Sequence, residues 1–276
     1  MKLRVVELLL VTTLPALFLA SEGVPDLSIT FWSLLGGTFA AGGANAFNMV
    51  IEAKSDLLMK RTAKRPIATG EISRNNGLLF ATLISLISLL IFYIFTTPLA
   101  TLLTFLAITF YVFGYTIALK KHTSQNIVWG GIAGCMPVLI GQAAVTNSLT
   151  TTSWLFFLLI FFWTPPHFWA LAIRHSDDYR AAGVPMLPVV ATMEETVRSM
   201  VIYSVILTAT SLVLVPVANL GYIYGITALL FGTLFILGSI RLGRDPSESR
   251  SMRLFSFSIT YVSVLFMAVT VDVLVN

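Results

Sequence analysis

The sequence predicts an all-α membrane protein with nine transmembrane helices. Hydrophobic residues make up 57% of its 276 residues and charged residues only 11%, whereas a typical soluble domain carries roughly 25% charged residues. The mean hydropathy is +0.88. The lysines and arginines are also unevenly distributed, because they are confined to every second segment between the apolar runs. Composition and charge distribution together indicate a chain that crosses the membrane many times.

Nine apolar runs have the length that a membrane span needs. A bilayer core about 30 Å thick requires roughly 20 apolar residues per helix. No stretch between the runs resembles a flexible linker, a low-complexity tract or a second domain, so we expect residues 1–276 to form a single domain. The predicted spans are 5–21, 28–50, 77–96, 98–118, 126–145, 153–173, 197–217, 220–240 and 254–275.

The positions of the cations predict the orientation. All 17 Lys and Arg residues lie on one side of a nine-span chain: two at the N-terminus, six in 51–76, two in 119–125, three in 174–198 and four in 241–253. By the positive-inside rule that side is the cytoplasm, which places the N-terminus inside and the C-terminus outside. With no Arg- and Ser-rich transit peptide ahead of the first span, we expect the cell (inner) membrane of a bacterium or archaeon rather than an organelle.

Two features exclude other classes. The single cysteine, Cys135, cannot form an intramolecular disulfide or a multi-cysteine metal site, and its apolar surroundings favour buried packing. The net charge of +4 could suggest nucleic-acid binding. Because the cations follow the membrane topology instead, we expect no nucleic-acid partner.

An amide and two acids followed by basic residues form the first candidate site. At helical spacing Asn48, Glu52 and Asp56 share one face. Mg²⁺ usually takes one or two carboxylates and completes its shell with waters and substrate phosphates. Nearby cations would then neutralise a diphosphate. The alternative is an ordinary basic membrane border balanced by two acids. The candidate diphosphate-binding residues are Arg61, Lys64 and Arg65.

A second candidate site begins in the sixth predicted span. His167 lies in an apolar aromatic run that also contains Trp163 and Trp169. A lone intramembrane histidine is either a packed, hydrogen-bonded residue or a ligand. Asp177 and Asp178 follow at the cytoplasmic border, where the alternative to a site is simple capping of the loop. Of the two acids, Asp178 is the better candidate because it heads the run Asp-Tyr-Arg-Ala-Ala-Gly.

Tyr115, Lys120 and Lys121 end the fourth predicted span on the same side as both acidic clusters. The two lysines are either ordinary border residues or diphosphate ligands. The segments 51–76 and 174–196 are long enough to fold back as cytoplasmic caps, and long loops in compact proteins tend to be functional. An offset of 122 residues superposes Asp56 on Asp178 and Pro66 on Pro188, which suggests an internal duplication.

The motifs resemble the UbiA-type intramembrane prenyltransferase superfamily. Asn48-x-x-x-Glu52-x-x-x-Asp56 is similar to its first acidic motif, although the superfamily's general form has Asp where this chain has Glu52. Met59 to Pro66, His167-Phe-Trp-Ala-Leu-Ala-Ile and Asp178 to Pro188 are similar to the heme O synthase (protoheme IX farnesyltransferase) branch. The resemblance runs from about residue 2 to the last span.

The resemblance implies a nine-helix bundle around a central cavity with two cytoplasmic cap loops. It implies transfer of a farnesyl group from farnesyl diphosphate to the vinyl group of heme B, giving heme O and diphosphate. Downstream heme A synthase or oxidase assembly factors are candidate partners. By the same resemblance, Asn48, Glu52, Asp56 and Asp178 would hold Mg²⁺ and the diphosphate. Candidate acceptor contacts are His167, Trp163, Trp169 and Tyr115.

Three alternatives stay open on the sequence. A related prenyltransferase could act on another aromatic or tetrapyrrole acceptor. A transporter would also have many spans and an internal duplication, but it needs polar residues near the bilayer midplane. Here the acids gather at one face. A heme-binding structural subunit would need several intramembrane histidines, and only His167 lies in such a position.

Overall fold

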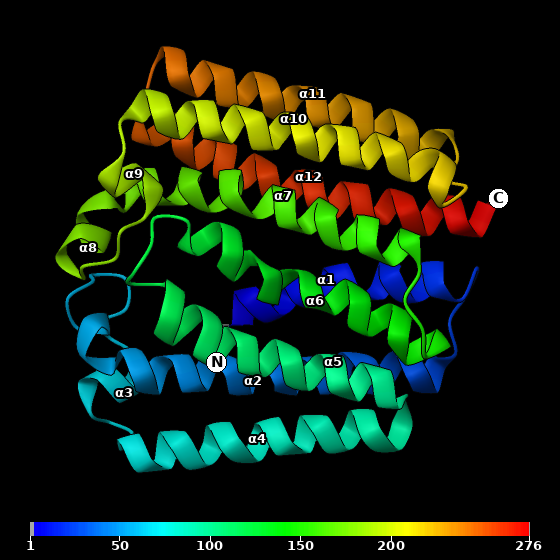
Figure 1. Cartoon of the computed structure of the whole chain (residues 1–276), viewed down its shortest axis with the longest axis horizontal. Helices are drawn as coiled ribbons and strands as arrows, with labels where there is room; N and C mark the ends of the chain where they lie inside the picture. The colour runs from blue at the N-terminus through cyan, green and yellow to red at the C-terminus, as the bar shows by residue number, and fades with distance from the viewer. Residues whose placement is uncertain (1–2, 276) are drawn as a thin grey trace.

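The computed structural model describes residues 3–275, with side chains from residue 11 onward, and contains no strand in this range. The prediction of an all-α protein is confirmed (Figure 1). Three short helices lie outside the bundle: α3 (Pro66–Thr69), α8 (Ser176–Ala181) and α9 (Leu187–Val190). The long elements are α1 (Leu3–Ala20), α2 (Leu27–Asp56), α4 (Arg74–Phe95), α5 (Pro98–Thr109) continuing as η1 (Phe110–Leu119), α6 (Asn126–Thr146), α7 (Thr151–Arg174), α10 (Met193–Val217), α11 (Tyr222–Arg244) and α12 (Glu248–Val275).

Most of the predicted spans are confirmed as membrane helices. Eight helices are long and apolar enough to cross a membrane, with α5 and η1 counted as one. The span predicted at 5–21 corresponds to α1, which contributes the apolar stretch Val11–Ala20 among the residues with described side chains. The described chain is therefore that of a multi-pass membrane protein. The helix that contains the second predicted span, 28–50, continues to Asp56, in agreement with the helical spacing of Asn48, Glu52 and Asp56.

Capping side chains mark where the helices begin. Asp26 accepts a 2.9 Å hydrogen bond from the backbone N–H of Ile29 at the start of α2. Thr150 and Thr192 open α7 and α10 with capping boxes. Such side chains satisfy backbone donors that would otherwise lack a partner at a helix N-terminus. The short polar connections thus fix the boundaries that the apolar runs leave open.

The long helices form a closed ring in chain order. Each packs against the next, and α12 closes the ring by packing against α1. Contacts of α1 with α6 and of α7 with α12 cross the ring and divide it into two halves. In Figure 1 α4 and α2 lie at one edge of the bundle and α10 and α11 at the other. The first half runs from α1 to α6 and the second from α7 to α12.

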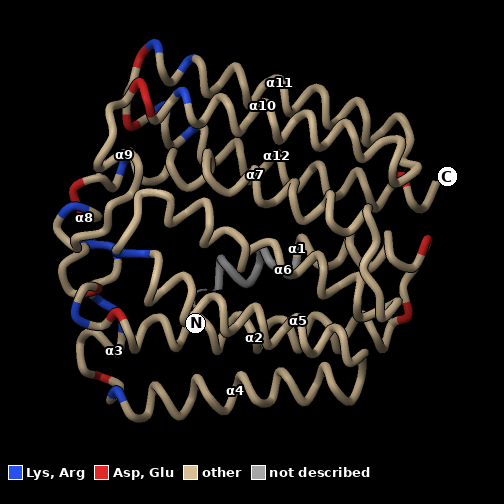
Figure 2. The backbone as a smooth tube through the Cα atoms, in the orientation of Figure 1, with Lys and Arg blue, Asp and Glu red and all other residues tan. Residues whose placement is uncertain are grey.

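The charged residues mark one end of the bundle. Figure 2 shows the described lysines and arginines gathered beside α3, α8 and α9, which we call the cationic end. The opposite end carries acidic residues and no Lys or Arg among the described side chains. The side chains of Lys2 and Arg4, which we also assigned to the basic side, lie outside the described residues. The alternation of connecting segments predicted from the cations therefore matches the described part of the fold.

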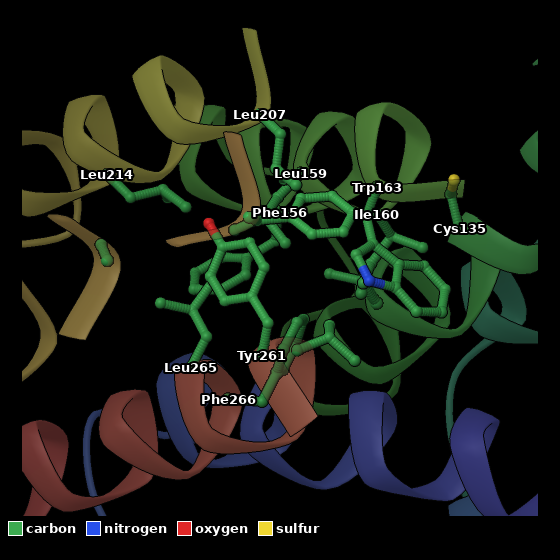
Figure 3. Packing of buried hydrophobic residues seen from close by; sticks show 14 of the residues in the cluster. Cys135, Phe156, Leu159, Ile160, Trp163, Leu207, Leu214, Tyr261, Leu265 and Phe266 are labelled. Atoms are coloured by element: carbon green, nitrogen blue, oxygen red, sulfur yellow. The ribbon is translucent and has the colours of Figure 1, made fainter. Parts of the chain in front are cut away.

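The second half contains the largest cluster of buried hydrophobic residues. Its core joins large side chains of α7, α10 and α12, among them Phe156, Leu207, Tyr261 and Phe266, all nearly or fully buried (Figure 3). Phe156 and Phe266 meet with ring centroids 5.5 Å apart. Buried hydroxyls of α10 mostly donate to carbonyl groups one turn earlier, as Ser204 does to Met200 at 2.8 Å. This half is therefore held together mainly by packed aromatic and aliphatic side chains.

Candidate active site

The first half encloses a cavity of about 320 Å³ that also reaches α7. At the cationic end its wall carries charged and phenolic groups, and further in it becomes apolar. Small residues of α2 and α6, such as Ala41 and Gly134, face it along much of its length. The polar groups at the cationic end are Asp56, Arg61, Arg65, Lys120 and Tyr179. The cavity thus has an ionic mouth and an apolar interior, as an amphiphilic substrate requires.

Asp56 is the last residue of α2 and lines this mouth. It is 1% exposed, and Nη1 of Arg65 donates to both of its carboxylate oxygens at 2.8 and 2.7 Å. The hydroxyl of Thr62 donates to the Asp56 carbonyl at 2.9 Å and satisfies the helix end. A carboxylate buried this deeply needs such a cation, because an unpaired buried charge costs about 3–5 kcal/mol. The turn after α2 therefore positions Asp56 and Arg65 together.

Glu52 and Asn48 lie one and two turns earlier on α2. The Asn48 amide donates to Glu52 Oε2 at 2.8 Å and to the Thr116 hydroxyl at 3.2 Å. Lys120 Nζ reaches the same Glu52 oxygen at 2.5 Å. The predicted shared helix face is confirmed. Of the predicted site residues in this group, Lys120 lines the cavity, whereas Asn48 and Glu52 lie just behind its wall.

The position of Lys120 depends on a stretch of π-helix that the sequence did not reveal. The backbone N–H of Lys120 donates to the Tyr115 carbonyl at 2.9 Å, five residues back, at the end of η1. The wider turn leaves the ammonium 6.0 Å from the centre of the Tyr115 ring, which also lines the cavity. π-helical turns are rare and recur at functional sites. Here one carries a lysine and a tyrosine to the same wall.

Asp178 lies on α8, beside the mouth. Its side chain is 18% exposed, and its Oδ2 is 4.0 Å from Nδ1 of His175. Burial, reinforced by the charge of Arg61, holds the pKa of His175 below its usual 6.5, so this histidine is neutral at pH 7. The neighbouring Tyr179 lines the cavity, and Arg61 approaches its hydroxyl at 3.5 Å. Asp178 itself is not among the cavity-lining residues.

The two predicted caps interlock over the mouth. Met59, from the first cap, packs in one buried cluster with Tyr179, Val184 and Met186 from the second. Gly183, with φ of +66°, takes the left-handed conformation that turns the chain after α8. The caps bring the two acidic motifs, far apart in sequence, to the same end of the cavity.

His167 is buried between aromatic rings rather than exposed to the cavity. Its ring centroid lies 4.2 Å from that of Trp163 and 4.5 Å from that of Phe255, and both pairs are stacked. Its Nδ1 lies 2.6 Å from the Ser258 hydroxyl. Trp163 lines the cavity and donates to the Ser258 carbonyl at 2.8 Å. His167 therefore does not line the cavity itself, but its ring contacts two residues that do, Trp163 and Phe168.

Besides Asn48, Glu52, Asp178 and His167, three more predicted residues do not line the cavity. Trp169 is buried in the core of the second half, edge-on to Tyr203 at 5.6 Å. Lys64 and Lys121 are exposed and do not line the cavity. Sequence spacing could not separate Lys120 from Lys121, because the π-helical turn decides which of them points inward.

Our prediction omitted three residues of the site. Tyr111 lines the cavity, and its hydroxyl donates at 3.2 Å to Asn45, another lining residue. Tyr179 is the third. Asn45 lies three residues before Asn48 and Tyr111 four before Tyr115, so helical spacing from the chosen residues could have identified both.

The donors at the mouth suit Mg²⁺ bound together with phosphate. Among the described side chains, no three His, Cys, Asp or Glu residues are close enough to hold a metal ion by themselves. Mg²⁺ does not require such a cage, since it usually takes one or two carboxylates and fills its shell with waters and phosphate oxygens. Asp56 at the wall, with Glu52 and Asn48 behind it, fits that pattern.

The fold and the site define an intramembrane prenyltransferase, and comparison with known proteins gives the family. Residues 9–268 match the UbiA prenyltransferase family, and the chain belongs to it. A protoheme IX farnesyltransferase of Streptomyces avermitilis is 47% identical over 98% of this chain and 91% of its own length.

Two solved structures share the fold at low sequence identity. A UbiA homologue from Aeropyrum pernix K1 superposes with a TM-score of 0.76 at 19% identity and covers 99% of both chains. A UbiA homologue from Archaeoglobus fulgidus, bound to GPP and Mg²⁺, superposes with a TM-score of 0.68 at 17% identity, over 97% of this chain and 98% of its own. At these identities the likeness supports the fold alone.

Proposed function

We propose that the protein is a heme O synthase, which transfers the farnesyl group of farnesyl diphosphate to the vinyl group of heme B. The observation that carries the proposal is the cavity with an ionic mouth and an apolar interior, in a chain whose relative at 47% identity is a protoheme IX farnesyltransferase. A donor with a diphosphate head and an isoprenoid tail matches both parts of the cavity. The C–O bond to diphosphate breaks, farnesyl forms a C–C bond with the vinyl group, and one water adds its hydroxyl to the resulting cation and releases a proton, so the products are heme O and diphosphate.

The residues at the mouth act on the leaving group. Negative charge builds up on the diphosphate as the allylic C–O bond breaks, and cations aimed at it stabilise that transition state. Arg61, Arg65 and Lys120 line the wall where the diphosphate would bind. Mg²⁺, when bound by Asp56 and Asp178 with Glu52 and Asn48, supplies further charge neutralisation as a Lewis acid.

The apolar part of the cavity wall binds the farnesyl chain. Small residues of α2 and α6 near the mouth and the middle of the cavity, such as Ala41 and Gly134, leave room for the farnesyl chain, and the packed caps limit the entry of water to the reactive allylic centre. The rings of Tyr111 and Tyr115 lie between the mouth and the apolar interior, where their faces stabilise developing positive charge. Trp163, supported by His167, forms part of the wall for the acceptor.

The test is to express the chain in a strain that makes heme B but no heme O, to extract the hemes and to determine their molecular masses by mass spectrometry. We expect a new species with the mass of heme O, absent from cells that carry Asp56→Asn. The purified protein in lipid should also release diphosphate from farnesyl diphosphate only when heme B is added. If another ring accepts the farnesyl group and heme B does not, the acceptor we propose is wrong. Movement of solute across liposomes without product would favour a transporter.

We also propose that the cationic end faces the cytoplasm in the cell (inner) membrane, in accordance with the positive-inside rule. This places both caps and both acidic motifs on the side where soluble farnesyl diphosphate is available. Cysteines introduced at Thr123 and Ser148 should react from opposite sides with a membrane-impermeant thiol reagent. Cys135 is buried and should contribute little background. Labelling of both positions from the same side would overturn this orientation.

A further inference from the structure

The cavity is longer than a farnesyl diphosphate molecule. Along α2 its wall runs from Asp56 at the mouth to Ser33, 23 residues earlier, which is about 34 Å at 1.5 Å per residue. Extended farnesyl diphosphate measures roughly 20 Å, if each bond of about 1.5 Å advances the chain by about 1.3 Å. A donor with its diphosphate at the mouth would leave the far part of the cavity unfilled.

Two glycines open directly into the cavity. At Gly37 and Gly134 an added Cβ atom would meet nothing within 4 Å, and both residues line the wall. Their neighbours differ. At Gly36 the added atom would lie 2.8 Å from Phe92, and at Gly131 3.0 Å from Thr164. Gly36 and Gly131 therefore allow close packing of neighbouring side chains, whereas Gly37 and Gly134 leave space in the cavity for a bound prenyl chain.

The two open glycines lie at different depths. Gly134 follows the lining residue Ile127, which packs beneath the caps, by seven residues, or about 10 Å along α6. Gly37 precedes Asp56 by 19 residues, or about 28 Å along α2. A farnesyl chain passes the depth of Gly134 and ends before Gly37. Each further isoprene unit adds about 5 Å, so a five-unit chain reaches Gly37.

The far end of the cavity is lined by buried residues. Ser33 is 1% exposed, lines the cavity and makes no hydrogen bond through its hydroxyl to any described residue. Fully buried Phe92 forms part of the same end. A buried hydroxyl without a partner is uncommon, and this one belongs to a residue that lines the cavity.

We infer that the cavity accepts all-trans prenyl diphosphates of four and five isoprene units as well as farnesyl diphosphate, and that Gly37 sets the upper limit of donor length. The inference rests on the proposed function only in placing the diphosphate at the cationic mouth. Donor length would be limited by the space beside Gly37 and not by a wall at the end of the farnesyl chain.

The experiment compares donors of three, four and five isoprene units in the wild-type protein and in two leucine variants. Gly37→Leu should leave kcat/KM for the three-unit donor within about 3-fold and lower it at least 10-fold for the five-unit donor. Gly134→Leu, the matched inner variant, should lower kcat/KM for all three donors by a similar factor. Wild-type values for the three- and four-unit donors should agree within 10-fold.

Gly37→Ala is the conservative control, since an added Cβ has room there, and all donors should behave as in the wild type. Thermal unfolding checks that the leucine variants fold, which we expect because leucine favours a helix more than glycine does. Displacement of labelled farnesyl thiodiphosphate by unreactive donor analogues measures length dependence without heme. If analogues of all three lengths bind but no donor gives a heme product, the proposed function fails and this inference stands.

Two results would overturn the inference. One is a wild-type protein that discriminates against the four-unit donor more than 100-fold in the displacement assay while converting farnesyl diphosphate normally. The other is a Gly37→Leu variant in which kcat/KM falls by the same factor for the three-unit donor as for the five-unit donor. That result would mean that the far end binds the farnesyl chain itself or the acceptor.

Discussion

The two halves of the ring share a plan but differ in what fills them. In each half a long helix, α2 or α7, ends at the cationic end and is followed by a cap with a short proline-containing helix, α3 or α9. The first half faces its interior with Gly and Ala and keeps a cavity. The second fills its interior with Phe, Tyr and Leu. Side-chain volume, rather than helix arrangement, decides which half binds a substrate.

The acidic residues of the two halves differ in burial and in their ion-pair partners. Asp56 ends a long helix, is 1% exposed and is held by Arg65 at 2.7 Å. Asp178, 122 residues later, lies on a six-residue helix, is 18% exposed and has only the neutral His175 at 4.0 Å. The first acid is therefore fixed before any ligand binds, and the second is held less tightly. We expect the first half to carry more of the binding and catalysis.

Asp56→Asn should have the largest effect. Loss of the carboxylate removes a metal ligand and leaves Arg65 without its partner, so we expect heme O formation to fall at least about 10³-fold, as when a major transition-state contact is lost. Product analysis by mass spectrometry measures this, and immunodetection in the membrane fraction controls for insertion. Activity near the wild-type level would exclude Asp56 as a metal ligand.

Asp178→Asn should have a smaller effect, on the order of 10²-fold in kcat/KM, because this carboxylate is more exposed and less constrained. We also expect its Mg²⁺ half-saturation to rise. Asp177→Asn is the matched control, since Asp177 is 95% exposed and pairs with Arg180 on the protein surface. If the two variants behave alike, the second acidic motif has no metal role.

The sequence predicted much of this arrangement, and its failures have physical causes. Hydropathy and cation positions predicted the helices and their alternation, because the bilayer imposes both. The spacing of Asn48, Glu52 and Asp56 predicted their shared helix face, but it did not predict the contacts of Glu52 with Lys120 and of Asp56 with Arg65. Long-range contacts of this kind cannot be derived from spacing.

The aromatic motif illustrates the same limit. Sequence pattern placed His167, Trp163 and Trp169 together as candidate acceptor contacts, but the fold separates them. Trp163 faces the cavity, His167 stacks behind it and Trp169 points into the second half. Which face of α7 meets the cavity depends on how α6 and α12 pack against it, and no local pattern encodes that.

His167→Ala should lower heme O formation about 10-fold while farnesyl binding stays within about 2-fold, because loss of the stacked ring lets Trp163 shift at the acceptor wall. Displacement of labelled farnesyl thiodiphosphate separates the two effects. Ser258→Ala, which removes only the hydroxyl contact at 2.6 Å, should have a weaker effect in the same direction. Equal loss of donor binding and product would make His167 a residue of general packing.

The smallest effect should come from Lys121, and its contrast with Lys120 tests the π-helical turn. Lys120→Met should weaken farnesyl diphosphate binding about 10-fold, because an ammonium at the cavity wall and its bond to Glu52 are both lost. Lys121→Met should change binding less than about 2-fold, since an exposed cation contributes little after solvent screening. Titration of the donor analogue at fixed Mg²⁺ measures both. If Lys121 gives the larger loss, Lys121 rather than Lys120 contacts the donor, and the π-helical turn does not direct Lys120 to the diphosphate.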